Sequence, residues 1–136
     1  MVRRPLLSGG AGLDDRQANM LTCTLREHDG AVCLAVDGEL DLASVASFLG
    51  YLQRAGNGGR DVVVDLQKLR YIDSSGINAL LRARERCART GQRIALADVP
   101  ARIRRILDIV AAAEVIPMFP TVDAALAGVR DGTKPV

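Results

Sequence analysis

The segment from Val62 to Leu81 limits the choice of fold more than any other part of the chain. It opens with a nearly continuous run of β-branched and aliphatic residues, Val62 to Leu66, which is typical of a strand that is central in a sheet or covered on both faces. After a short loop, serines and a glycine precede Ile77, Leu80 and Leu81, which share one helical stripe. A buried strand followed by an amphipathic helix predicts an α/β domain.

An alternating pattern ahead of this segment predicts that the sheet begins with a hairpin. Apolar and polar residues alternate from Leu21 to Arg26 and again from Ala31 to Asp37. The Asp29-Gly30 pair between the two runs is typical of a tight turn. We therefore expect the first two strands to pair antiparallel.

Helical spacing and cap residues mark the remaining elements. A helix is expected from about Val45 to Leu52, with Asp41 capping its first turn, and Gly91 should close the helix that begins after Asp73. Three further elements are predicted: a strand at 94–96, a helix that Pro100 opens and that buries Ile103, Ile106, Leu107 and Val110, and a last helix that Thr121 caps. This order predicts a small mixed β-sheet with helices packed mainly on one face.

The domain is expected to span residues 20–130. Residues 1–19 are rich in Gly, Arg, Asp and Ser and have no sustained period, which is typical of a disordered tail, and residues 131–136 form a short C-terminal tail. Two interpretations of the first 19 residues stay open: a disordered extension, or translation that begins at Met20. A chain of 136 residues has room for one domain.

Composition and charge argue against several function classes. A net charge of +2 is too small to argue for nucleic acid by itself, because phosphate binding needs a concentrated basic face, so direct nucleic-acid binding is not expected. The three cysteines form no C-x-x-C pair, and their odd number favours reduced thiols over a disulfide framework or a zinc site. No apolar run approaches the roughly 20 residues of a membrane-spanning helix. We expect a cytoplasmic protein with no membrane contact, no cofactor and no metal.

The tetrapeptide Asp73-Ser74-Ser75-Gly76 is the segment best suited to regulation. It delivers two hydroxyl groups to the start of a helix, where backbone N–H groups lack helical partners. Negative charge is tolerated at that position, and a phosphoserine brings about −1.5 to −2 charges. The simpler structural explanation is that Ser74 or Ser75 is only an N-cap and that Gly76 only permits close packing.

Three motifs, in order along the chain, favour regulation over that simpler explanation. They are Gly38-Glu39-Leu40-Asp41, the strand Val62–Leu66, and Tyr71-Ile72-Asp73-Ser74-Ser75-Gly76-Ile77. With the helical segment Phe119–Leu126, they resemble the anti-sigma factor antagonists of the STAS domain family over about residues 21–129. The resemblance implies a single STAS-like domain.

The resemblance also implies a binding protein and not an enzyme, so we assign no catalytic residue. In that family the first serine of the motif is phosphorylated by an anti-sigma factor that is itself a serine kinase, and Ser74 holds that position. The unphosphorylated antagonist binds the anti-sigma factor and releases a sigma factor, phosphorylation breaks the complex, and a serine phosphatase resets it. The partner-binding residues assigned in this way, from the resemblance and from the charge argument, are Asp41, Asp73, Ser74, Ser75 and Gly76.

Other functions compete with this one. The main alternative is a STAS accessory module that binds a small ligand or a membrane transport complex, because related domains occur on transporters. A hydrolase with Ser74 as nucleophile would need a base, but the only histidine, His28, lies in the predicted hairpin turn and nothing places Lys68 near Ser74. Arginines of the later helices suit an acidic partner or nucleic acid, although an aromatic content of 3% gives little support for base stacking: Arg82, Arg84, Arg86, Arg89, Arg102, Arg104 and Arg105.

Overall fold

The computed structural model describes residues 21–110, 112 and 115–132, so the expectations for residues 1–20 and 133–136 lie outside the described residues. In chain order the elements are β1 (Leu21–His28), β2 (Ala31–Leu40), α3 (Val45–Ala55), a short 3-10 turn (Asn57–Gly59), β3 (Asp61–Ile72), α4 (Ser74–Thr90), β4 (Ile94–Ala97), α5 (Ala101–Ile109), β5 (Met118–Phe119) and α6 (Val122–Asp131). The helix α6 ends at Asp131, one residue beyond the expected domain boundary.

The strands form a mixed sheet in the order β1-β2-β3-β4-β5. β1 and β2 pair antiparallel, as predicted, and the remaining neighbours pair parallel. Asp29 and Gly30 have φ angles of 46° and 88°, the left-handed conformation that a two-residue hairpin turn requires at both positions. The strand β3 lies at the centre of the sheet, where the run of β-branched residues placed it.

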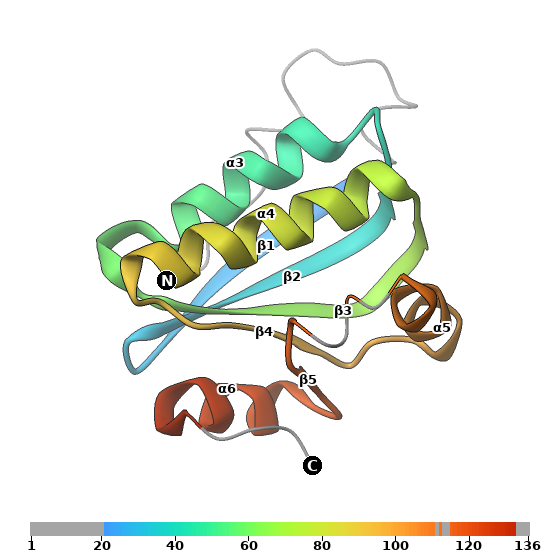
Figure 1. Cartoon of the computed structure of the whole chain (residues 1–136). Helices are drawn as coiled ribbons and strands as arrows, with labels where there is room; N and C mark the ends of the chain where they lie inside the picture. Colours follow the sequence, from blue (N-terminus) through green and yellow to red (C-terminus); the bar gives the residue numbers. More distant parts are fainter. Residues whose placement is uncertain (1–20, 111, 113–114, 133–136) are drawn as a thin grey trace.

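Helices cover both faces of the sheet, but unequally (Figure 1). α3 and α4 lie on one face, and residues of α5 join the same large core cluster as Val62, Val64 and Leu66. α6 packs on the opposite face against a smaller cluster that contains Val63. Successive side chains of a strand point to opposite faces, so cover on both sides explains why Val62, Val63 and Val64 are apolar in succession. The prediction of helices mainly on one face is confirmed.

Three details differ from the sequence-based expectations. The loop expected between Leu66 and Asp73 is strand, because β3 continues to Ile72. The two-residue strand β5 was not predicted. Val110 is 47% exposed just beyond the end of α5, whereas Ile103 and Leu107 are buried as expected. No helix in the described ranges is long and apolar enough to cross a membrane.

Candidate functional site

The predicted site lies at the carboxyl ends of β2 and β3. These strands run parallel, with Leu40 opposite Ile72, so the segments that follow them, 41–44 and 73–76, emerge at the same edge of the sheet. The backbone N–H of Asp73 donates to the carbonyl oxygen of Leu40 at 3.2 Å and ties the two segments together. The fold thus brings Asp41 and Asp73 to one edge of the sheet, and it places Leu42 beside Asp73, 31 positions further along the chain.

The carboxylate of Asp73 holds the start of α4. Its Oδ1 accepts hydrogen bonds from the N–H groups of Ser75 and Gly76, at 2.9 and 3.2 Å. Its Oδ2 accepts a longer bond, 3.3 Å, from the N–H of Leu42 in the neighbouring segment. The N-cap is therefore Asp73 and not Ser74 or Ser75, and two N–H groups that we expected to be unpaired are already occupied.

Ser74 is the first residue of α4, and its side chain is exposed. Its Oγ makes no hydrogen bond within the described part of the chain. Ser75 is half-buried, and its N–H belongs to the cap. Of the two hydroxyl-bearing residues, Ser74 is thus the more accessible to a partner or a modifying enzyme.

Asp41 caps a turn that precedes α3. Its Oδ1 accepts from the N–H groups of Ala43 and Ser44, both at 3.1 Å, and its own carbonyl accepts from Val45 at 2.9 Å. The sequence had indicated a cap on the first turn of the helix itself, but that helix begins only at Val45 and has no side-chain cap. The buried hydroxyl of Ser44 donates to the carbonyl of Glu39 at 2.8 Å, which fixes the turn against the end of β2.

Two residues of this turn, Leu42 and Ser44, were not predicted from the sequence. Leu42 is 75% exposed and is held beside the α4 cap through its N–H bond to Asp73. By spacing it continues the apolar stripe of Val45, Leu49 and Leu52, so no signal in the sequence indicated that it lies before the helix and stays exposed. Ser44 carried no signal either, because its role depends on the carbonyl of Glu39.

Gly76 sets the position of α4. A Cβ atom at this residue would lie 2.7 Å from Leu40 Cγ, 2.8 Å from Ile72 Cγ1 and 2.8 Å from the Leu40 carbonyl oxygen. Any larger residue would therefore push the helix away from the ends of both strands. Gly76 is buried, so an effect of this residue on partner binding would act through the placement of Ser74.

The arrangement is suited to respond to added negative charge. Within the described residues, neither Asp41 nor Asp73 takes part in an ion pair. A phosphate on Ser74 would stand next to a carboxylate that already accepts bonds from three N–H groups. The new charge would meet like-charge repulsion and few free donors.

Neither of the bases considered for a hydrolase lies where Ser74 needs one. His28 ends β1 and pairs with Ala31, which pairs with Asp61 at the amino end of β3. β3 has 12 residues, so at about 3.3 Å per residue His28 and Ser74 are roughly 35 Å apart. Lys68 lines a hollow together with residues of β1 and β2, and Ser74 is not part of its lining. The described residues hold no group of three potential metal ligands.

Comparisons with known proteins cover most of the chain. Residues 22–125 match the family model of the STAS domain. The anti-sigma-F factor antagonist RsfA of Mycobacterium tuberculosis is 28% identical over 112 residues, which cover 80% of this chain and 88% of that protein.

Solved structures show the same fold. An anti-sigma factor antagonist from Mycobacterium paratuberculosis superposes with a TM-score of 0.76 at 23% identity, over 83% of this chain and 97% of the other. The Bacillus cell fate determinant SpoIIAA in its phosphorylated form superposes with a TM-score of 0.62 at 20% identity, over 79% of this chain and 99% of the other.

Proposed function

The chain belongs to the STAS domain family, and on this premise we propose that it is an anti-sigma factor antagonist that phosphorylation of Ser74 switches off. The observation that carries the proposal is an exposed, unbonded hydroxyl on a helix start that Asp73 fixes beside the exposed side chain of Leu42. The name of the mycobacterial relative and the phosphorylated form of the Bacillus protein support it.

In the unphosphorylated state, the surface around Ser74 docks on the anti-sigma factor. Leu42 contributes an apolar contact, and the small Ser74 side chain lets the partner approach closely. A phosphate adds about −1.5 to −2 charges next to Asp73, and close docking would have to desolvate them. A penalty of about 3 kcal/mol weakens an affinity roughly a hundredfold. Release of the antagonist then lets the anti-sigma factor recapture its sigma factor.

In this proposal the anti-sigma factor is the serine kinase, and a serine phosphatase restores the free hydroxyl in the cytoplasm. The antagonist contributes a substrate residue and no catalytic group. Exposure of Ser74 meets the first requirement of such a substrate, which is access to the hydroxyl.

The site assignment is tested by phosphorylation in vitro. Incubation of the full chain with its cognate kinase and ATP should add one phosphate, and peptide mass spectrometry should place it on Ser74. Ser75→Ala is the matched control, because it removes the neighbouring hydroxyl, and it should still be phosphorylated. A phosphate found only on Ser75 or Thr121 contradicts the assignment.

The switch is tested by calorimetric titration of the anti-sigma factor. Ser74→Ala should bind as tightly as the unphosphorylated protein, whereas Ser74→Glu, which supplies part of the phosphate charge, should bind at least about tenfold more weakly. Equal affinities of the two variants would exclude the charge mechanism. If no anti-sigma factor of the same genome binds either variant, the accessory-module alternative becomes the better explanation.

A further inference from the structure

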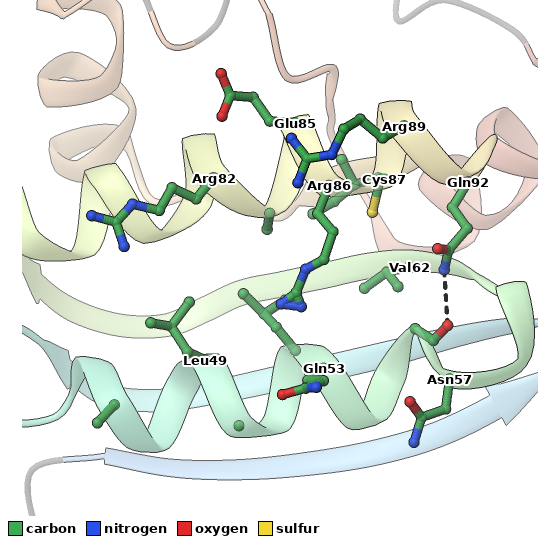
Figure 2. A pocket seen from close by; sticks show the side chains of 16 residues that line it. Leu49, Gln53, Asn57, Val62, Arg82, Glu85, Arg86, Cys87, Arg89 and Gln92 are labelled. Atoms are coloured by element: carbon green, nitrogen blue, oxygen red, sulfur yellow. Dashed lines mark hydrogen bonds between the residues drawn. The ribbon is translucent and has the colours of Figure 1, made fainter.

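A groove of about 730 Å³ runs between α3 and α4, away from the site described above (Figure 2). None of the residues 41–44 or 73–76 lines it. Its deeper part is apolar, with the buried side chains of Leu52, Val62 and Ile94 among the lining. The groove is thus a separate surface that shares only the helix α4 with the Ser74 site.

The two walls of the groove differ in character. The α3 wall carries uncharged residues at helical spacing, two of which, Ala46 and Gly50, are small: Ala46, Leu49, Gly50 and Gln53. The α4 wall carries charged side chains at the same i, i+3, i+4, i+7 spacing: Arg82, Glu85, Arg86 and Arg89. Ala46 and Gly50 on the α3 wall leave space in the groove. The three arginines and one glutamate of the α4 wall give that space a net positive charge.

The charges of the α4 wall have no partner within the described residues. Other arginines of the molecule are paired, for example Arg60 with Glu27 and Arg104 with Asp108. None of the four charged residues of the wall forms an ion pair or a hydrogen bond through its side chain. In Figure 2, Arg86 extends from α4 in the direction of Gln53 on α3. Three unpaired guanidinium groups beside apolar surface attract carboxylates strongly once water is displaced.

The shape and ends of the groove favour a polypeptide over a compact anion. Arg82 and Arg89 are seven residues apart, so their backbone positions are about 10 Å apart along the helix, too far for one phosphate to meet both ends. Among the described residues, no aromatic side chain lines the groove, so they offer a nucleobase no ring to stack on.

We propose that this groove docks an acidic amphipathic helix of a partner protein. The apolar side chains of that helix lie against Leu49 and the floor, and its carboxylates pair with Arg82, Arg86 and Arg89. The proposal goes beyond the Ser74 switch and does not depend on it, because the groove shares no lining residue with that site.

The test uses a designed 18-residue peptide with leucines at i, i+3, i+4 and i+7 and glutamates elsewhere, labelled with fluorescein. Fluorescence anisotropy with the full chain should show saturable binding that weakens as salt rises. The double variant R82E/R86E should bind the peptide about tenfold or more weakly. The matched control R84E/R105E changes the charge equally at exposed arginines outside the groove, and its affinity should stay within about twofold of the original.

A second variant tests whether peptide binding needs the open volume of the groove, independently of its charge. A Cβ atom at Gly50 meets nothing within 4 Å, so Gly50→Gln is compatible with α3 and extends a side chain into the groove. It should weaken peptide binding severalfold while the melting temperature does not fall. Ser74→Glu should bind the peptide like the original chain, which separates this proposal from the phosphorylation switch.

Two kinds of result would overturn the proposal. One is absence of peptide binding, or equal affinity of R82E/R86E and R84E/R105E. The other is binding of ATP or an oligothymidylate that is tighter than binding of the peptide and that R82E/R86E abolishes, which would assign the groove to a nucleotide.

Discussion

The two halves of α4 differ in how tightly they are held by the rest of the molecule. In the first turn, the N–H groups of Ser75 and Gly76 are held by Asp73, and Gly76 is packed against Leu40 and Ile72. In the second half, charged side chains without partners stand beside an open groove. Dense packing fixes the backbone that presents the exposed Ser74 hydroxyl, as recognition of a single modified residue requires. Sparse packing leaves side chains free to adjust to a partner surface.

The rates at which cysteine thiols are modified should show the largest contrast between tightly packed and open regions. Burial raises the pKa of Cys23 to about 12 and, together with nearby Asp65, that of Cys33 to about 11. Cys87 lines the groove and is half-buried, and burial raises its pKa as well, while Arg86 opposes the shift. At pH 8, a thiol reagent should modify Cys87 at least about a thousandfold faster than Cys23, because Cys23 is 1% exposed and reacts only on unfolding.

Mass spectrometry of the labelled protein measures these rates. The Cys87 rate should rise as the pH increases toward and beyond 9, since the reactive thiolate forms above its raised pKa. Equal labelling rates of Cys87 and Cys23 would show that the core opens as readily as the groove.

Gly76→Ala should produce the largest loss of stability. The new methyl group meets Leu40 and Ile72 at 2.7 to 2.8 Å, and one of these contacts is a backbone carbonyl that cannot rotate away. We expect the free energy of unfolding to fall by about 2 to 3 kcal/mol, measured by urea denaturation. An unchanged midpoint would mean that the start of α4 is not tightly seated.

Asp73→Ala should cost less, about 1 to 2 kcal/mol, because the variant loses the cap but introduces no clash. The amide of Leu42 should also exchange faster with deuterium, since its acceptor is gone. Asp73→Asn keeps an acceptor oxygen and is the matched control, with a smaller loss. Equal losses for both variants would argue that the carboxylate charge, and not the cap geometry, holds the helix start.

Gly50→Ala should have the smallest effect and the opposite sign. Its methyl group enters open space in the groove, and alanine favours a helix over glycine by about 0.5 to 1 kcal/mol. Gly50→Ala should therefore raise the denaturation midpoint slightly, whereas Gly76→Ala should lower it. A fall would show that the groove is narrower than the structure indicates.

Local patterns predicted most of the fold. The alternating pattern and the Asp29-Gly30 pair predicted the hairpin. Thr121 was predicted to cap α6, and in the structure its Oγ accepts a hydrogen bond from the N–H of Ala124. The second half of β3 was missed because Gln67, Lys68 and Arg70 are exposed and interrupt the apolar run. β5 has two residues, too few for any period.

At the Ser74 site and at the groove, the features that could not be predicted from the sequence depend on contacts between segments that are distant along the chain. The Asp73-Ser74-Ser75-Gly76 motif was visible in the sequence, but the bond of Asp73 to Leu42 depends on two parallel strands that end at the same edge. The arginine stripe of α4 was equally visible. Its lack of partners and the small side chains opposite became apparent only when α3 was placed beside it.

The length of β3 has a practical consequence for measurement. The exposed Asp29-Gly30 turn lies at the opposite end of the sheet from Ser74, roughly 35 Å away. A fluorophore attached at this hairpin would stand clear of a partner docked on the serine. Paired with an acceptor dye on that partner, it would turn the chain into an energy-transfer sensor that follows association and release in real time without obstructing either.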